Sequence, residues 1–529
     1  MMSPFPFSLS DSHFGWLVAL IFGFSLIGYT VYGAIWRLYL SPVAHIPGPL
    51  FAALTFWNEF YYDVYLGGKY TWKIAEYHEK YGPIVRINPY EIHIKDTEFY
   101  DTLYVSGSKA KSNKWYWSMR MFGTQNVGAF DTLDHDMHRM RREPWNPYYS
   151  KQSVSRLQPL LIQAIVDKLC NRLGEYQTAR KPVVMTHAFS NLTADIISEY
   201  SFPKGYNLLD KPEFDSQHYK AWMALFGVGH TLKQFGWLYP LLSSMPVWVV
   251  KKANPLFYCF LREQETLLEQ AIEISKQRGK SDSKELTTRP SMMEAFMNSD
   301  LPESEKTPER IQGEAKTAIG AGTLTTAHAL KNATYHILAN PDVHERLMQE
   351  LEEGIPDPSL PLNLRGLEQL PYLTAVMHET LRIFVGTSHR LQRIFPDRAL
   401  QYRDFTIPPG TPISMSTIHT LHDPSIFPDP LKFDPDRWLP LKSEGQRLLR
   451  YLVVWGRGSR ACVGKELGQA EILTTLATVF RKFGRNMTLY ETSRVKDIDI
   501  VYDNFSPLPS RESNGVMVSF NKISGNGHI

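Results

Sequence analysis

Hydrophobic positions follow several patterns along this chain, and the first is an uninterrupted apolar run. Residues 14–36 (FGWLVALIFGFSLIGYTVYGAIW) contain no charged side chain. At about 1.5 Å per residue, a helix of this length crosses the roughly 30 Å hydrocarbon core of a bilayer. A cleaved signal peptide is the alternative, but its apolar region usually has only about 7–15 residues and follows a basic segment. We therefore predict an uncleaved transmembrane anchor over 14–36.

Charges beside this run predict its orientation. Arg37 follows it immediately, and no Lys or Arg precedes it. Because positive charge favours the cytosolic side, residues 1–13 are expected to be lumenal and everything after the anchor cytosolic. Residues 37–50 then contain Pro42, Pro47 and Pro49, which favour extended backbone and predict a stiff linker.

Residues 51–529 show no second linker and no internal repeat, which indicates one folded domain. A helical pattern at YTWKIAEYHEKY precedes an alternating strand pair, IVRINPYEIHI, that turns at NPY. The longest helix is predicted from the capping pair Thr307-Pro308 to Asn340-Pro341. A strand-rich patch at 399–416 and a helix over 465–483 follow. The expected fold class is mainly α with small β-sheets to one side.

Composition removes several classes of function. Hydrophobic residues make up 43% of the chain and charged residues 21%, as in a folded protein with a large core. The 57 basic and 54 acidic residues are dispersed without a basic block, which excludes a nucleic-acid-binding arm. The only three cysteines, Cys170, Cys259 and Cys462, lack CxxC spacing, so neither a disulfide framework nor a zinc site fits.

The chemistry is concentrated in one stretch, WGRGSRACVG at residues 455–464. A cysteine thiolate such as that of Cys462 is a strong iron ligand, and as the axial ligand of haem it promotes cleavage of the O–O bond. Gly458 permits a tight turn, and Gly464 lets backbone amides approach the sulfur. Arg460 carries a planar guanidinium that suits a haem carboxylate.

This stretch resembles the haem-binding signature F-x-x-G-x-R-x-C-x-G of the cytochrome P450 family, with Trp455 where phenylalanine is usual. The larger ring could alter hydrogen bonds to the thiolate and hence the iron potential. The resemblance extends from about residue 37 to the C-terminus. It implies haem b (iron protoporphyrin IX) on Cys462, O2 as oxidant, and electrons from NADPH through a cytochrome P450 reductase, with cytochrome b5 as a further partner.

Two other motifs resemble structural and oxygen-handling parts of the family. Glu379 and Arg382 lie three residues apart in VMHETLRIF, and Arg437 follows in FDPDRW. The resemblance implies that these three residues form a buried charged scaffold behind the haem loop. Breaking one partner of such a group typically costs about 3–5 kcal/mol.

The middle of the long helix, AIGAGTLTTA, is rich in poor helix formers. Ala321, Gly322 and Thr325 match the family pattern in which the helix opens over the iron and a threonine hydroxyl steers protons. The alternative is a threonine that bonds back to its own helix and only bends it. Leu324 stands where the family usually carries an acid, so proton transfer is expected to use Thr325 or Thr326 with water, in a slower or more uncoupled enzyme.

Four basic side chains are predicted by resemblance to hold the two haem propionates. One pair, four residues apart, matches the family's W-x-x-x-R pattern with histidine in place of tryptophan, and another residue follows the Glu379 helix in HRLQR. The four are His138, Arg142, Arg390 and Arg460. Arg139 and Arg141 are expected on a solvated face, where they could meet the reductase.

The segments that line the pocket in this family are apolar here: 115–130, 384–388 and 505–508. Such a lining suits a lipophilic substrate. Residues 235–250 (FGWLYPLLSSMPVWVV) either dip into the bilayer or form an ordinary buried helix. The N-terminal part resembles the fungal microsomal branch, particularly trichodiene-oxygenase-type enzymes of secondary metabolism, which implies the endoplasmic reticulum membrane and a terpenoid or terpenoid/alkaloid substrate.

The leading prediction is hydroxylation or epoxidation. Two alternatives stay open at this point. One is a rearrangement or dehydration that needs no reductase, which Leu324 favours. The other is a non-catalytic membrane haem protein.

Overall fold

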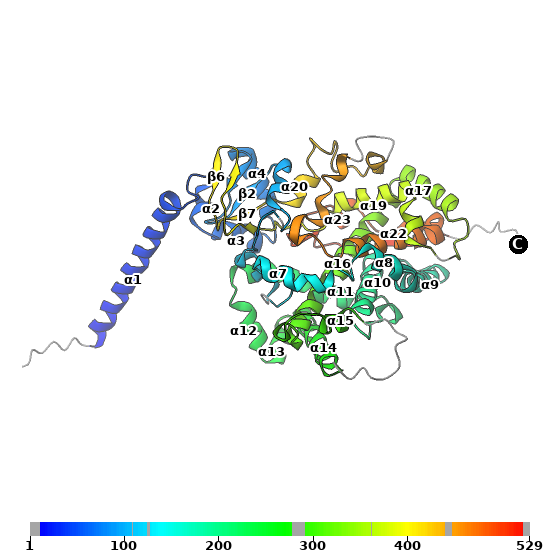
Figure 1. Ribbon diagram of the computed structural model, residues 1–529, viewed down its shortest axis with the longest axis horizontal. Coiled ribbons are helices and arrows are strands. Elements are labelled where there is room, and N and C mark those ends of the chain that lie inside the picture. The colour runs from blue at the N-terminus through cyan, green and yellow to red at the C-terminus, as the bar shows by residue number, and fades with distance from the viewer. Residues whose placement is uncertain are drawn as a thin grey trace, which may run out of the picture.

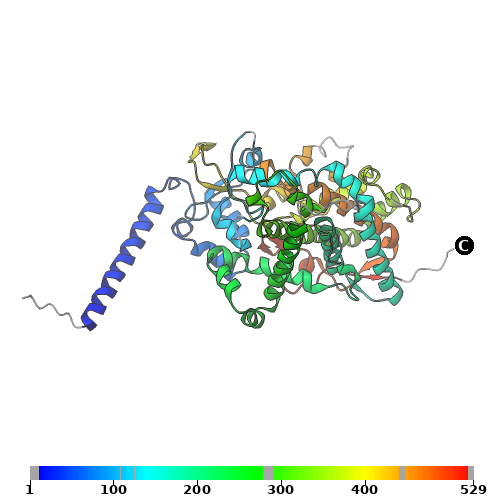
Figure 2. The same cartoon turned by 60° about the horizontal axis from the view of Figure 1, so that its bottom comes forward.

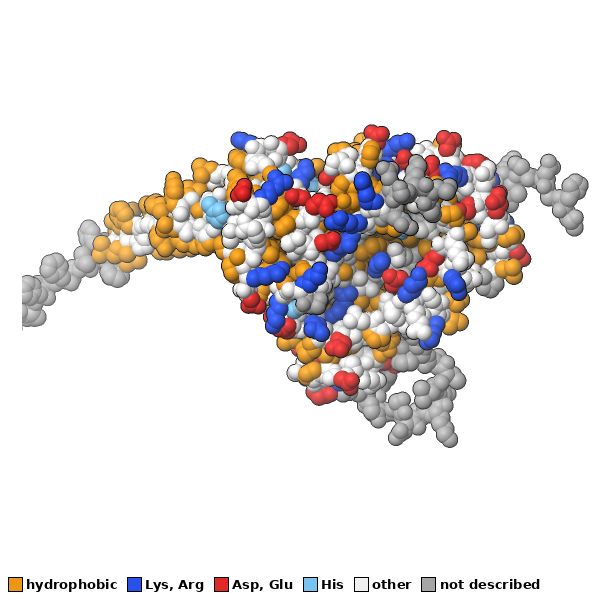
Figure 3. Space-filling model, turned by 45° about the horizontal axis from the view of Figure 1, so that its top comes forward, with side chains coloured by type: hydrophobic (Ala, Val, Ile, Leu, Met, Phe, Trp, Pro, Cys, Tyr) orange, Lys and Arg blue, Asp and Glu red, His pale blue; other side chains and the backbone are white. Residues whose placement is uncertain are grey.

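The computed structural model describes residues 11–107, 109–123, 127–277, 291–360, 362–439 and 447–521. Helix α1 (Asp11–Ile35) projects away from the body and continues into a π-helical turn, Trp36–Leu40 (Figure 1). Residues Gly15–Leu40 are long and apolar enough to cross a membrane, and their exposed apolar side chains cover the projecting arm (Figure 3). This helix contains the predicted anchor 14–36, whereas most of the predicted lumenal segment lies outside the described residues.

The small sheets join segments that are far apart in the sequence. The first has the order β1-β2-β7-β4, and β2 and β7 are parallel, with Ile92 opposite Ile413. Its β1 and β2 form the antiparallel pair predicted around the NPY turn. A second sheet has the order β3-β11-β8, and two further hairpins pair β5 with β6 and β9 with β10. The strands are β1 Ile84–Arg86, β2 Ile92–Ile94, β3 Val183–Val184, β4 Arg393–Ile394, β5 Leu400–Tyr402, β6 Phe405–Ile407, β7 Pro412–Ser414, β8 Met487–Leu489, β9 Tyr502–Asn504, β10 Ser506–Leu508 and β11 Met517–Phe520.

Helices make up most of the body, as the fold-class prediction required, and they lie beside the first sheet (Figures 1 and 2). The first half of the body contains α2 Leu50–Leu54, α3 Trp57–Phe60, α4 Tyr70–Tyr81, α5 Tyr100–Leu103, α6 Tyr116–Met119, α7 His135–Arg142, α8 Lys151–Leu157, α9 Gln163–Ala179, α10 Met185–Ser201, α11 Ser216–Gln234, α12 Leu238–Ser244, α13 Val247–Ala253 and α14 Pro255–Gln277. The second half contains α15 Met292–Met297, α16 Pro308–Ala339, α17 Pro341–Gly354, α18 Leu364–Glu368, α19 Pro371–Phe384, α20 Thr417–Leu421, α22 Lys465–Phe483 and α23 Arg494–Asp497.

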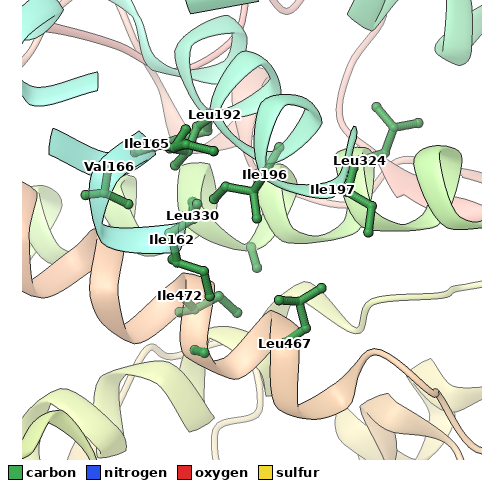
Figure 4. Packing of buried hydrophobic residues seen from close by; sticks show 14 of the residues in the cluster. Ile162, Ile165, Val166, Leu192, Ile196, Ile197, Leu324, Leu330, Leu467 and Ile472 are labelled. Atoms are coloured by element: carbon green, nitrogen blue, oxygen red, sulfur yellow. The ribbon is translucent and has the colours of Figure 1, made fainter. Parts of the chain in front are cut away.

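The long helix α16 is the centre of the body. It begins as predicted, with the Thr307 side chain accepting a hydrogen bond from the Arg310 amide and Pro308 in the first turn. It packs against α10, α14, α19 and α22. Figure 4 shows Leu324 and Leu330 of this helix among isoleucines and leucines of neighbouring helices. Burial on several sides explains how α16 tolerates a central stretch of poor helix formers.

Candidate active site

The Cys462 loop is held by contacts that its glycines permit. The Cys462 amide donates to the Trp455 carbonyl at 2.8 Å. Gly458 has a φ of +71°, and a Cβ there would lie 2.2 Å from the Val105 carbonyl oxygen, so no other residue fits without a backbone shift. Gly464 has an ordinary φ of −82° and room for a Cβ, with the nearest atoms 3.9 Å away or more.

The thiol of Cys462 is solvent-accessible although it lies deep among protein atoms. Burial raises its pKa, while a hydrogen bond from the Gly464 amide and the charge of Arg142 lower it. The Gly464 amide therefore approaches the sulfur as predicted, through its N–H and without a requirement for glycine. A thiol with an amide donor and a nearby cation is suited to bind a metal as thiolate.

Trp455 packs beside the loop on α22. A Cβ on Gly468 would lie 3.2 Å from the Trp455 ring and 3.7 Å from the Thr326 hydroxyl, so this ring and α16 meet at α22. The indole Nε1 is buried, with no hydrogen-bond partner among the described residues. Because phenylalanine has no such donor, Trp455 adds an unused N–H next to the cysteine loop.

One face of α16 is exposed in the middle of the helix. Ala321 and Thr325 lie four residues apart, on the same face, and both are exposed. The neighbouring residues Leu324 and Thr326 are buried. Thr325 Oγ1 donates to the Ala321 carbonyl at 2.7 Å, which is the back-bond considered as the alternative for this threonine. The same hydroxyl lies on the exposed face, so the back-bond and a role at the site are compatible.

The structure gives the neighbouring residues packing roles. A Cβ on Gly322 would lie 2.8 Å from the Ile197 side chain, so glycine allows α10 to approach α16 closely. Leu324 is 1% exposed and points into the apolar core near Ile197 (Figure 4). Thr326 is also buried, and its hydroxyl lies close to Gly468 of α22. Leu324 carries no group that can relay a proton.

Buried cations gather on the other side of the loop. Arg142 donates to the Ala461 carbonyl at 2.8 Å, and Arg460 donates to the Thr132 and Leu133 carbonyls at 2.6 and 2.8 Å. His138 is 3% exposed, with Nδ1 unpartnered in the described structure. Burial, reinforced by Arg460, lowers the pKa of His138 to about 2.

Arg390 is not in this cluster, which corrects the prediction from HRLQR. Its guanidinium is 1% exposed and pairs with Glu59 at 2.8 Å and Glu91 at 2.9 Å, over the ring of Tyr70. Because Arg390 is already paired with two buried carboxylates, it is not expected to bind a haem propionate.

Two residues that sequence reasoning missed, Arg393 and Lys114, belong to the cluster instead. Burial lowers the pKa of Lys114 well below its usual range, and the charges of Arg460 and Arg393 lower it further. Arg393 lies three residues after Arg390, in β4. The strand period would have separated the two arginines onto opposite faces, but nothing in the sequence indicated which face meets the loop.

The cluster fits the haem that the sequence implies. Lys114, Arg142, Arg393 and Arg460 all act on His138, and two carboxylates offset part of this charge: Asp131 interacts with Lys114, and Asp134 interacts with Arg460. Burial, together with the smaller effect of the Arg393 charge, lowers the pKa of Arg460 to about 9. An excess of positive charge in a low-dielectric interior favours an anionic ligand, and the two propionates of haem would supply two negative charges beside the Cys462 thiol.

Comparison with known proteins decides the family. A family model described as Cytochrome P450 matches residues 47–502. The chain belongs to the cytochrome P450 family. Among similar proteins, the cytochrome P450 monooxygenase tpcC of Cochliobolus heterostrophus is 42% identical over 520 residues, covering 95% of this chain and 96% of the relative. The tryptophan 6-hydroxylase fscE of Fusarium equiseti is 41% identical, covering 92% and 94%.

A third relative, the N-acetyltryptophan 6-hydroxylase ivoC of Emericella nidulans, is 39% identical, covering 93% of this chain and 95% of the relative. The P450 relatives are monooxygenases of fungal secondary metabolism, and this chain is a P450 monooxygenase of the same group. The family implies a haem-iron cofactor.

The P450 scaffold behind the loop is a dense buried group. Arg382 contacts both carboxylate oxygens of Glu379 at 2.8 Å, and Arg437 donates to the same carboxylate at 3.1 Å. Trp438 Nε1 adds a donor at 2.9 Å. Arg382 also donates to the Leu421 carbonyl at 3.0 Å, so the group ties α19 to the end of α20. Every charge is paired, as a buried ion group requires.

Arg141 corrects the expectation of a solvated basic face on α7. It is 5% exposed and bonds Glu305 through two nitrogens, at 2.8 and 3.0 Å. Arg139 is exposed, as expected. The HRMRR run therefore contains one cation paired with Glu305, one that bonds the Cys462 loop and one at the surface, and its composition alone could not separate them.

Proposed function

We propose that this P450 inserts one oxygen atom of O2 into a lipophilic fungal secondary metabolite by hydroxylation or epoxidation, with a terpenoid or terpenoid/alkaloid hybrid as substrate. The observation that carries the proposal is the approach of α16 to the Cys462 loop, where Thr326 and Trp455 meet at Gly468, with Cys462 and the Ala321–Thr325 face of α16 both exposed. Bound haem supplies O2 activation at a thiolate-ligated iron. Electrons come from NADPH through the reductase, with cytochrome b5 as a further donor.

The chain's own residues would divide the remaining work. Cys462 ligates the iron, and the Gly464 amide stabilises its sulfur. Arg142, His138, Arg393 and Arg460 hold the propionates, with Trp455 packed beside the thiolate. The space proposed between this face of α16 and the Cys462 loop is called the chamber here. Thr325 Oγ1, which donates to the Ala321 carbonyl, can exchange that acceptor for a water in the chamber and so hold a proton there. Leu324 supplies no acid, so bulk water must provide the proton.

Aromatic rings pack together in the segments that are expected to line the chamber, which suits an apolar substrate. Phe505 makes edge contacts with Phe122 at 4.9 Å and Phe130 at 6.2 Å between ring centroids, and it stacks on Phe226 at 5.9 Å. Aromatic walls bind flat or polycyclic hydrocarbons through large contact areas. They equally suit an indole. The two tryptophan-hydroxylating relatives therefore favour, as a second candidate, an aromatic amino-acid derivative.

A membrane setting supports a lipophilic substrate. Residues 235–250 expose large apolar side chains, with Trp237 64% and Trp248 70% exposed, so they do not form the ordinary buried helix that was the alternative. An exposed apolar surface of this kind favours contact with lipid. A nearby pocket of about 240 Å³ is lined by Arg37, Thr55, Phe56, Trp57, Trp117, Gln234 and Phe235. We propose that substrate enters here, with α1 anchored in the endoplasmic reticulum membrane and the body in the cytosol.

The experiment is co-expression with a reductase, followed by incubation of microsomes with a terpene panel, tryptophan and N-acetyltryptophan. A product heavier by one oxygen, formed only with NADPH and labelled by 18O2, supports the proposal. Turnover of a substrate without NADPH would instead identify the rearrangement or dehydration alternative. A carbon monoxide difference spectrum without the band of thiolate-ligated haem would contradict both, and a normal band without any turnover would favour the non-catalytic alternative.

A further inference from the structure

A second buried polar group lies next to Phe505 in the sequence. It is separate from the cluster of basic side chains beside the Cys462 loop. Its centre is Asp503, which is fully buried in β9, two residues before Phe505. Four donors reach its carboxylate: the Phe505 amide at 3.1 Å, Ser388 Oγ at 2.8 Å, His389 Nδ1 at 3.1 Å and Thr71 Oγ1 at 2.6 Å. Although burial opposes ionisation, His389 and these donors hold the pKa of Asp503 well below its usual range.

Phe505 needs this support because its backbone is strained. Its φ of +72° lies in the left-handed region, which costs an L-residue roughly 1–2 kcal/mol. Asp503 fixes the Phe505 amide, while the Phe505 carbonyl accepts from the Ser388 amide at 3.1 Å. The carboxylate of Asp503 thus ties together two of the segments that are expected to line the chamber, 384–388 and 505–508.

The same group reaches the helix that carries the next aromatic ring. His230 of α11 donates from Nε2 to the Asp503 carbonyl at 2.5 Å, and Lys233, one turn further, pairs with Glu59 at 2.7 Å. Both side chains are almost fully buried. Phe226, one turn before His230, stacks on Phe505. The positions of the two stacked rings, Phe226 and Phe505, are therefore linked through the polar contacts between His230 and Asp503.

A metal ion is a competing explanation for this group. Ligand atoms of His230, His389 and Asp503 lie within 4.8 Å of one another. However, protein donors already occupy both carboxylate oxygens of Asp503, and both ring nitrogens of His230 face protein oxygens: Nε2 donates to the Asp503 carbonyl, and Nδ1 lies 3.3 Å from the Asp63 carboxylate. These contacts form a hydrogen-bonded network centred on Asp503, and they leave no need for a metal ion.

We propose that Asp503 is a positioning residue that fixes the Phe505 ring against α11 and thereby sets which ligand shapes the chamber accepts. This rests on the proposed function, since it assumes that the chamber beside Thr325 holds the substrate. Asp503 itself touches neither substrate nor haem. It acts through Phe505, and that dependence can be measured.

The test is a double-mutant cycle on the holoenzyme, with Asp503→Ala, Phe505→Ala and the double variant. The probes are imidazole and 4-phenylimidazole, two iron ligands that differ by a phenyl ring, with Kd measured from difference spectra. We expect each single variant to change the ratio of the two Kd values at least about fivefold, and the double variant to add nothing further. Asp503→Asn, which keeps an acceptor oxygen, should lie nearer the wild type.

Asp195→Asn is the matched control, because Asp195 is also buried and accepts two amides, from Leu208 and Leu209, away from the chamber. It should leave the ratio unchanged. If Asp503→Ala yields no holoprotein, Ser388→Ala replaces it in the cycle. An unchanged ratio in either variant, or additive effects in the double variant, overturns the inference. Failure of the wild type to show thiolate-ligated haem would overturn the proposed function instead.

Discussion

Replacing Gly458 by alanine should disable the cysteine loop, whereas the same change at Gly464 should be tolerated. The two glycines flank Cys462 and are equally prominent in the sequence. Their surroundings differ: a Cβ at Gly458 would lie 2.2 Å from the Val105 carbonyl oxygen and 2.4 Å from that of Tyr104, while one at Gly464 meets nothing within 3.9 Å.

The magnitude follows from three contributions. A left-handed φ of +71° costs alanine roughly 1–2 kcal/mol. To relieve the overlap, the backbone at Tyr104 and Val105 must move. Overpacking of this kind typically costs about 1–3 kcal/mol of stability. That movement also weakens the bond from the Ser459 amide to the Val105 carbonyl, worth about 1 kcal/mol. The expected loss is about 3–6 kcal/mol, a large share of the 5–15 kcal/mol that typically stabilises a protein.

The assay compares both variants with the wild type by haem content, by the carbon monoxide difference spectrum and by thermal unfolding. Gly458→Ala should lose most of the thiolate-type band and melt at a lower temperature, and Gly464→Ala should resemble the wild type. Equal haem content and equal Tm for Gly458→Ala would refute the steric argument. Equal loss in both variants would show that glycine is needed at 464 for a contact with haem itself.

Three other changes give separate tests. Arg393→Ala should release haem about tenfold faster without a change in its far-UV spectrum, since a charged hydrogen bond contributes about 1.5–3 kcal/mol. An unaltered rate of haem release would show that Arg393 does not hold a propionate. Leu324→Glu should lower the free energy of unfolding by at least about 2 kcal/mol, because the acid enters an apolar core; normal stability with improved coupling to NADPH would contradict this. Burial raises the pKa of Glu263 to about 7, against hydrogen bonds from Trp222 and Tyr206, so stability should fall as pH rises from about 4.5 to 7. Glu263→Gln should flatten that slope, as measured by denaturant unfolding at pH 5 and 8.

The fold and the centre of the site were predictable because their signals are local. The anchor, the Thr307-capped helix and the helix over 465–483 each follow from periodicity or capping within one segment. The Cys462 loop and the E-x-x-R pair carry short motifs whose geometry is set within a few residues, and the structure forms the Glu379 ion group.

The errors have a different physical origin, since each depends on what lies across the fold. Whether Arg390 or Arg393 meets the haem cluster is decided by Glu59 and Glu91, some 300 residues earlier in the chain. Arg141 is buried because Glu305 lies opposite it. The direction of Leu324 depends on the packing of α10 on α16. The hydrogen-bonded network around Asp503 joins four distant segments, and no single stretch of sequence indicated this network.

The pairing of β2 with β7 and of β3 with β11 bears on how the molecule is made. Ile92 lies beside Ile413, and Val183 beside Val518, so each sheet closes a loop of more than three hundred residues. Closing such loops is slow. Although β2 can pair early with β1, its other edge and the whole of β3 wait unpaired until β7 and β11 leave the ribosome. Synthesis must be nearly complete before the body can close, and the iron ligand, at position 462, also emerges late. Chaperone demand and haem supply at the end of translation should therefore limit the yield of active protein.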